Sequence, residues 1–91
     1  MMERPALGST VYYVRYVWSG GYTSAQYEVR RGLYAASYSG PPFQLWLRFK
    51  DGSSVWVHES ALGRRVFTDP FEAEAVAEEW TKRLRESWGT L

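Results

Sequence analysis

The chain has 91 residues, of which 45% are hydrophobic, 18% aromatic and 23% charged, and its formal net charge is +1. This length predicts one domain, residues 1–91, with a thin core. The absence of cysteine excludes disulfides, thiolate metal sites and cysteine nucleophiles. No apolar run has the length of a signal-peptide core or of a membrane span, so we expect a cytoplasmic protein that does not enter a membrane.

The charge is unevenly distributed along the chain. Residues 1–68 hold eight Arg or Lys against four Asp or Glu, whereas residues 69–91 hold three against six. Nine of the eleven basic residues are Arg, a side chain suited to bidentate or stacked contacts. Either such contacts or a compositional bias of the genome explains this preference for Arg.

Two extended segments come first. Residues 10–18, TVYYVRYVW, are dense in β-branched and aromatic side chains and predict a strand. Neither side of that strand is plainly polar, so we expect both sides to be covered over part of its length. Residues 25–38 predict a second, long strand, in which Gly32 indicates a bulge or a sharp bend. The breaker SGPP at residues 39–42 ends it.

Residues 43–58, FQLWLRFKDGSSVWVH, predict a hairpin whose register depends on its turn. A two-residue turn at Asp51 and Gly52 would place Leu47 and Trp56 on one face and mix the two faces. A three-residue loop over 50–52, with Gly52 in the left-handed conformation, keeps the apolar odd positions together. We therefore predict the pairs Leu47–Val55, Leu45–Val57, Trp46–Trp56 and Gln44–His58.

The last part of the chain predicts a helix. Residues 59–65 are expected to form a short connection and residues 66–67 a brief last strand. Asp69 is the expected N-cap and Pro70 the first helical residue of a helix within 69–88. Apolar residues recur there at helical spacing and form one stripe, which consists of Ala73, Val76, Ala77, Trp80, Leu84 and Trp88.

The order of these elements, four or five strands and then one C-terminal helix, predicts an α+β fold with a small bent antiparallel sheet. Residues 8–67 resemble an SH3-like small β-barrel, the broad group that includes Tudor and KOW modules. The resemblance is carried by GSTVYYV at 8–14, by the bent strand around Gly32 and by LRFKDGSSVWV at 47–57. It implies a barrel-like part over 8–67 before the helix at 69–88, and a binding module for peptides, nucleic acid or other domains.

The sequence carries no pattern typical of catalysis or of metal binding. His58 is the only histidine, and the adjacent Glu59 would point to the opposite face of a strand. Ser53, Ser54 and Ser60 are turn and loop serines without a partner base. The glycines of SGGYTS lack the lysine and the spacing of a phosphate-binding loop, and no cluster of His, Asp and Glu has metal-ligand spacing. We expect no enzyme activity, no cofactor and no metal.

The second face of the predicted hairpin carries Trp46, Arg48, Trp56 and His58, and two interpretations of this face are open. Large exposed apolar patches usually mark contact surfaces, so in the first interpretation these residues bind a partner. The C-terminal helix must also bury its apolar stripe. In the second interpretation that stripe covers the same hairpin face.

Tyr22 and Tyr38 lie beside Gly, Ser and Pro in the expected loops. This mixture is typical of binding loops, in which rigid aromatic anchors have adaptable neighbours, so both tyrosines are candidates for partner binding. The alternative is that both fold back as lids on the ends of the barrel.

Single-stranded nucleic acid is a second class of partner. Arginines interleaved with Tyr and Trp suit stacking on bases together with phosphate contacts. The modest net charge and the acidic helix argue against this class. Its candidate residues are Arg15, Arg30, Arg31, Arg48, Arg64 and Arg65.

These patterns predict a non-enzymatic binding module that contacts another protein through aromatic burial and arginine hydrogen bonds. By analogy with phage-encoded inhibitors of host machinery, such a small domain would act as an inhibitor or adaptor that occludes a partner surface. The alternatives are single-stranded nucleic-acid binding and a self-associating structural protein, a homodimer with Trp46 and Trp56 in its contact.

Overall fold

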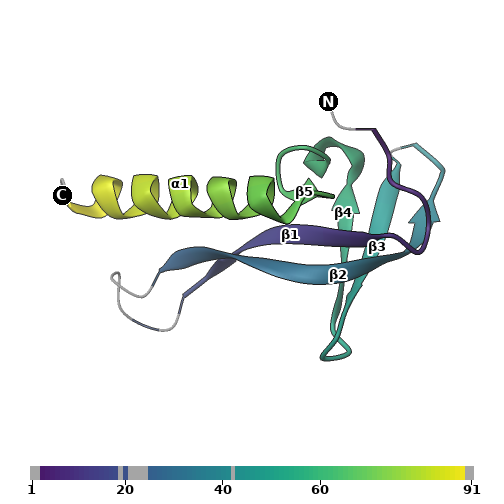
Figure 1. Ribbon diagram of the computed structural model, residues 1–91, viewed down its shortest axis with the longest axis horizontal. Helices are drawn as coiled ribbons and strands as arrows, with labels where there is room; N and C mark the ends of the chain where they lie inside the picture. The colour runs from purple at the N-terminus through teal and green to yellow at the C-terminus, as the bar shows by residue number, and fades with distance from the viewer. Residues whose placement is uncertain (1–2, 19, 21–24, 42, 90–91) are drawn as a thin grey trace.

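In the computed structural model the chain forms a five-stranded antiparallel sheet followed by one helix (Figure 1). The structure describes residues 3–18, 20, 25–41 and 43–89, with side chains described up to residue 87. The elements are β1 (Thr10–Val17), β2 (Gln26–Tyr38), β3 (Gln44–Phe49), β4 (Ser54–His58), the 3₁₀ helix η2 (Glu59–Ala61), β5 (Val66–Phe67) and α1 (Pro70–Gly89).

The strands lie in the order β4-β3-β2-β1-β5, so each strand up to β4 neighbours the next, and β5 returns to the far side of β1. The predicted α+β class, with four or five strands and one C-terminal helix, is confirmed. β4 and β5 remain the two edges of the sheet. The sheet is therefore open, and it is not closed into a barrel.

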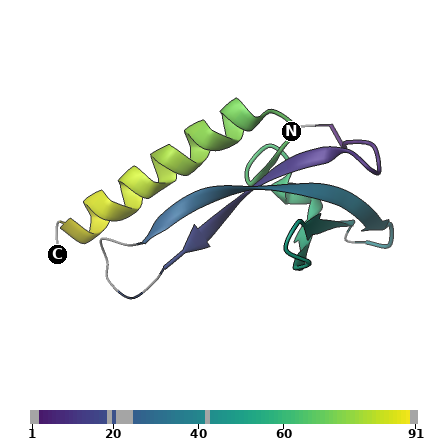
Figure 2. The ribbon, with the colours of Figure 1, turned by 60° about the horizontal axis from the view of Figure 1, so that its bottom comes forward.

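β2 belongs to two halves of the sheet. Its first part, Gln26 to Leu33, pairs with β1, and its second part, Gly32 to Tyr38, pairs with β3. Figure 2 shows β2 as the long ribbon that links the β1 end of the sheet to the β3–β4 hairpin. This shared strand lets the hairpin project from the sheet at a different direction from β1.

The irregularity of β2 lies beyond Gly32. The register with β3 shifts between Tyr34 and Ala36, so of the bulge or sharp bend predicted at Gly32, the bulge lies further along the strand. Gly32 has a different role, because a Cβ atom there would lie 2.9 Å from Cδ1 and Cε1 of Phe49. The missing side chain at Gly32 leaves room for the Phe49 ring to pack directly on the backbone of β2.

Two apolar clusters lie on opposite sides of β1. The first contains Val11 of β1 together with Leu45 and Leu47 of β3, all fully buried. The second contains Val14 of β1 and Phe67 of β5, which pack against α1. The prediction that both sides of the first strand are covered is therefore confirmed.

α1 forms the cover of the second cluster. The carboxylate of Asp69 accepts a hydrogen bond from the Phe71 N–H at 2.9 Å, as expected for the predicted N-cap. Ala73 and Ala77 are buried against β1, where their small side chains allow the helix to approach closely. Thr81 Oγ1 accepts a hydrogen bond from the backbone N–H of Tyr27 in β2 at 2.8 Å. The helix is thereby held by packing on β1 and β2 and by a polar contact to β2.

The β3–β4 hairpin has the predicted register. Leu45 pairs with Val57, Leu47 with Val55 and Trp46 with Trp56, and Gln44 lies across from His58. The loop closes with Gly52 at φ 90°, in the positive-φ region that glycine adopts without strain. The three-residue loop is therefore confirmed, and the hydrophobic pattern selected the register as expected.

We predict that Ala77→Leu destabilises the fold whereas Ala75→Leu does not. Ala77 is buried between α1 and β1, so a larger side chain there should reduce the free energy of unfolding by about 1–3 kcal/mol. Ala75 is exposed on the same helix, so Leu there should change the free energy by less than about 0.5 kcal/mol. Urea unfolding of both variants measures this, and equal effects would contradict the placement of α1.

Candidate functional site

The half of the sheet that α1 leaves uncovered presents one continuous face. Cross-strand partners in an antiparallel pair point to the same side, so the pairs Leu33–Arg48, Ala36–Trp46 and Trp46–Trp56 define that side. We call it the outer face. Its members are Leu33, Ala36, Tyr38, Gln44, Trp46, Arg48, Ser54, Trp56 and His58.

Trp46 and Trp56 form the centre of the outer face. Their rings are stacked, with centroids 5.7 Å apart and an interplanar angle of 14°. The bonds from Phe49 N–H to Ser53 O and from Glu59 N–H to Phe43 O mark hydrogen-bonded pairs at both ends of the hairpin. Because such pairs alternate along an antiparallel ladder, Trp46 and Trp56 are a non-hydrogen-bonded pair, in which side chains approach most closely.

The outer face is accessible. Trp56 is 51% exposed, Trp46 is partly buried, and the Arg48 guanidinium lies 6.0 Å from the Trp46 ring. Leu33 and Tyr38 extend the apolar surface onto β2, with 45% and 59% of their surface exposed. The predicted residues Trp46, Arg48 and Trp56 are therefore brought together at the surface.

The interpretation in which the helical stripe covers Trp46 and Trp56 is wrong. Val76 and Trp80 pack instead with Val14 of β1 in the second apolar cluster. The physical reason is that the side of β1 that carries Val14 is apolar and is buried only if the helix packs on it. The chain reaches α1 directly from β5, which lies beside β1, so this side is also the nearest one to the helix. Figure 1 shows α1 along the β1–β2 part of the sheet.

His58 turns toward the chain that follows it. Its Nδ1 accepts a hydrogen bond from the Ser60 N–H at 3.0 Å and lies 2.9 Å from Ser60 Oγ, so it caps η2. The expectation that Ser60 has no partner base is therefore wrong. The adjacent Glu59 forms an ion pair with Arg4. The imidazole at the edge of the outer face is thus positioned by a local capping contact.

The two loop tyrosines have different outcomes. Tyr38 packs over its own loop, because a Cβ atom at Gly40 would lie 2.9 Å from Tyr38 Cε1. The Tyr38 side chain is nonetheless largely exposed on the outer face. Tyr22 lies outside the described residues.

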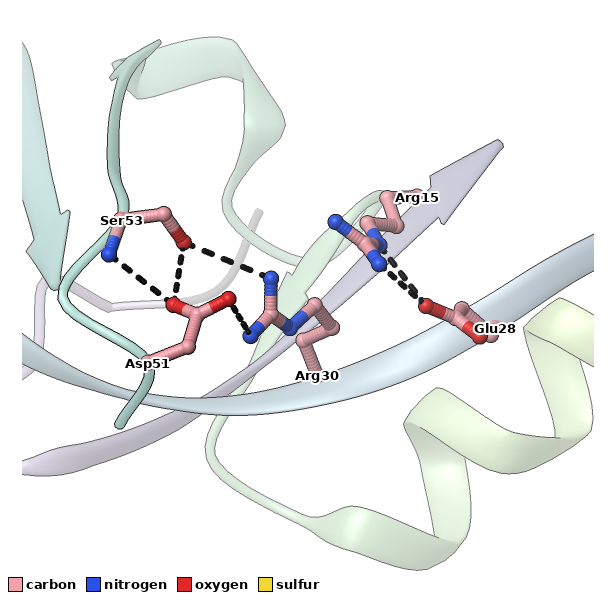
Figure 3. Close-up of polar contacts among 5 residues, drawn as sticks. All are labelled: Arg15, Glu28, Arg30, Asp51 and Ser53. Atoms are coloured by element: carbon pink, nitrogen blue, oxygen red, sulfur yellow. Dashed lines mark hydrogen bonds and ion pairs between the residues drawn. The ribbon is translucent and has the colours of Figure 1, made fainter. Parts of the chain in front are cut away.

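The arginines predicted for nucleic acid do not form one cluster. Arg15 pairs with Glu28 directly across the β1–β2 ladder, with an N–O distance of 2.7 Å (Figure 3). Arg65 donates a hydrogen bond to the Val14 carbonyl at 3.3 Å and lies over the Tyr13 ring. Structural contacts therefore occupy these two guanidinium groups.

Arg30 is occupied as well, and it ties β2 to the hairpin turn. Its guanidinium lies 2.9 Å from Asp51 Oδ2 and 4.6 Å from the centroid of the Phe49 ring (Figure 3). Arg31, the next residue, points to the other side of β2 and is exposed, as is Arg64. Within residues 3–87 of the described chain, no ion pair holds Arg31 or Arg64.

Sequence reasoning missed two residues, Leu33 and Lys50. They line an open cavity of about 570 Å³ beside the outer face, together with Arg31 and Arg48. The alternation within each strand indicates which side Leu33 takes. It does not indicate that β3 places Arg48 opposite Leu33, because this pairing depends on the bulge in β2. Three cations and one exposed leucine therefore meet at this cavity.

In the described part of the chain, no group of three or more His, Cys, Asp or Glu side chains is arranged to hold a metal ion. Of the helical segments described, none combines the length and apolar composition that a membrane crossing requires. Comparison of the chain with known protein families, with curated proteins and with solved structures finds no match.

We predict that Asp51 makes the stability of the protein depend on acid pH. The Ser53 hydroxyl and the Ser53 N–H donate hydrogen bonds to Asp51 Oδ1 at 2.6 and 2.9 Å, and Arg30 pairs with the same carboxylate. These contacts hold the pKa of Asp51 well below its ordinary value of 3.8. The stabilisation is therefore present above that value, and it is lost as the pH falls below it and the carboxylate takes up a proton.

The free energy of unfolding should accordingly fall more steeply with acidification in the wild type than in Asp51→Asn. Urea unfolding between about pH 5 and pH 2 measures both slopes. Asp69→Asn is a matched control, because asparagine retains N-cap ability and Asp69 has no such network. Parallel pH curves for the wild type and Asp51→Asn would contradict the role of this turn.

Proposed function

We propose that this protein is a non-enzymatic binding module whose outer face contacts another protein. The observation that carries the proposal is the exposed aromatic surface around Trp56, which α1 leaves uncovered. Contiguous apolar surfaces that a fold leaves exposed are usual at contact sites. The free energy of binding would come from burying Trp56, Tyr38 and Leu33 against the partner.

The composition of the outer face supports a protein partner. Tryptophan, tyrosine and arginine are the residues that most often dominate the binding free energy of protein interfaces. Trp46 and Trp56 are stacked before any partner arrives, so little conformational entropy remains to be lost on binding. Arg48 supplies hydrogen-bond donors beside them, while Gln44 and Ser54 form a polar rim.

The topology supports the proposed resemblance to SH3-like modules. β1 to β4 follow one another across the sheet, β5 returns beside β1, and the bend of β2 carries β3 and β4 away from β1. A small module of this kind would act as an inhibitor or an adaptor by occluding the surface of its partner. The basis for this role is the small size of the domain and its exposed aromatic surface.

We expect Trp56→Ala to abolish capture of the protein partner and Phe71→Ala to leave it intact. Phe71 is the matched control, because it is a large exposed apolar residue on α1 and lies away from the outer face. Affinity capture from extracts of the source cells, followed by titration of the captured protein, measures the effect. A central interface tryptophan is worth about 2 kcal/mol or more, so the Kd should rise at least about thirtyfold.

Two controls accompany that experiment. Circular dichroism and thermal unfolding must show that Trp56→Ala remains folded, as its exposure predicts. Sedimentation of the wild type at rising concentration distinguishes a separate partner from a second copy of this chain. Capture that persists in a folded Trp56→Ala variant would contradict the proposal.

Single-stranded nucleic acid is the second candidate, and one observation favours it. Arg31, Arg48 and Lys50 line an open cavity, Arg48 also lies near the Trp46 ring, and no ion pair holds these three cations among the described residues. Cations beside aromatic rings can track a phosphate backbone while bases stack. The outer face is narrow for this purpose, because Arg15 and Arg30 are occupied elsewhere.

Under the proposed function, an oligothymidine strand should not quench tryptophan fluorescence even at low salt. If nucleic acid is the partner, quenching should occur and weaken steeply as salt rises. Arg31→Ala should then reduce the slope of log K against log salt by about one, whereas Lys82→Ala on α1 should not. Quenching with this salt slope would contradict the proposed protein partner and support single-stranded nucleic acid as the ligand.

A further inference from the structure

The free edge of β4 borders a pocket that extends beyond the outer face. The pocket is open and has a volume of about 360 Å³. The consecutive residues Trp56, Val57 and His58 line one wall. Consecutive strand residues point to opposite faces, so a pocket that reaches all of them lies at the edge of the strand.

The edge of β4 has unpaired backbone groups. Val55 and Val57 occupy hydrogen-bonded positions of the β3–β4 ladder, because the pairs at Ser53 and Glu59 set the alternation. The N–H and C=O groups of Trp56 and His58 therefore point away from β3. In the part of the chain that the structure describes, no backbone hydrogen bond from a loop or another element reaches them. Such a row is a template for one more strand.

The facing wall of the pocket is cationic. Arg64 and Arg65 line it, and no Asp or Glu is among the lining residues. Arg64 is exposed and has no ion pair among residues 3–87, while the Arg65 guanidinium donates to the Val14 carbonyl and lies over the Tyr13 ring. The exposed Arg64 guanidinium, which has no carboxylate partner, and the positive charge of Arg65 beside it favour an acidic occupant.

Aromatic groups complete the pocket. Trp56 borders it from β4, Tyr13 from β1 and Trp80 from α1. Alternate side chains of an added strand point to opposite faces, so one set would lie next to Trp56 and the other would face the space toward Tyr13 and Arg64. An extended segment in which acidic and apolar residues alternate satisfies both surroundings.

We propose that the partner docks through an extended segment of alternating acidic and apolar residues, which adds to β4 as a sixth strand opposite Arg64 and Arg65. Main-chain hydrogen bonds to Trp56 and His58 would supply affinity, and the arginines would select for acidic side chains. This inference rests on the proposed function, because the edge of β4 and the outer face share Trp56 and would contact the same partner.

The test uses two short end-capped peptides, one of alternating valine and glutamate and one of alternating valine and lysine. Each is titrated into the ¹⁵N-labelled full chain while the backbone amide signals are followed. The glutamate peptide should shift the amide signals of Trp56 and His58 and slow their hydrogen exchange several-fold. The lysine peptide should bind at least about tenfold more weakly, since charge-assisted contacts are lost.

Variants at His58 isolate the backbone donor. The φ of His58 is −72°, which proline adopts, and its N–H points away from β3, so His58→Pro should preserve the hairpin. His58→Ala removes the same imidazole and retains the N–H. We expect His58→Pro to weaken binding of the glutamate peptide by about tenfold relative to His58→Ala.

A charge reversal tests the facing wall. Arg64→Glu should abolish the preference for glutamate and bring the lysine peptide to equal or tighter binding. Lys82→Glu, an exposed cation on α1 outside this pocket, is the matched control and should leave the preference unchanged.

Several outcomes would overturn the inference. These are equal binding of both peptides, binding of neither, and equal affinity of His58→Pro and His58→Ala. Shifts of the β4 amides with protein concentration alone would assign the edge to a second copy of this chain instead. Trp46→Ala separates the two proposals, because Trp46 belongs to the outer face and does not line the pocket. Partner capture that is lost in Trp46→Ala but persists in His58→Pro would support the outer face as the contact surface and would reject strand addition at the edge of β4.

Discussion

Burial on both sides of β1 is the constraint on which the rest of this structure depends. Val11 and Val14 are both fully buried, yet they lie in different clusters on opposite sides of the strand. A strand of this kind needs two covers, and the bent sheet supplies only one of them. The single helix has to supply the other. Because α1 is committed to β1, it is not available to β3 and β4, and the exposure of Trp56 follows from the burial of Val14.

The position of the helix also turns an uneven charge along the chain into a separation of charge in space. Residues 69–91 carry the acidic excess, and α1, which holds most of these acidic residues, lies along the β1–β2 part of the sheet (Figure 2). Arg31, Arg48 and Arg64 form no ion pair within the described residues, and they lie in the part built from β2, β3, β4 and the segment after η2. The same packing therefore exposes the aromatic rings and leaves their surroundings cationic, which is the combination that both proposals use.

Strand geometry decides which cations are available. Arg30 and Arg31 are adjacent in the chain and identical in chemistry, but they point to opposite sides of β2. Arg30 meets Asp51 and the ring of Phe49, so it stabilises the turn that sets the hairpin register. Arg31 reaches the open cavity beside Leu33. Composition alone treats the two residues as equivalent, whereas the fold assigns one to stability and one to the surface.

Local patterns in the sequence by themselves determined the α+β class, the helix start at Pro70 and the pairing of Trp46 with Trp56, because capping, turn geometry and side-chain alternation act over a few residues. Tertiary structure alone decided which face α1 covers, because β3–β4 and β1 both present apolar residues and only the position of β5 beside β1 favours the second. It also decided that Leu33 joins the cationic cavity, since the bulge in β2 sets the pairing of Leu33 with Arg48. The open edge of β4 has the same origin, because closure of a sheet depends on strands that are distant in sequence.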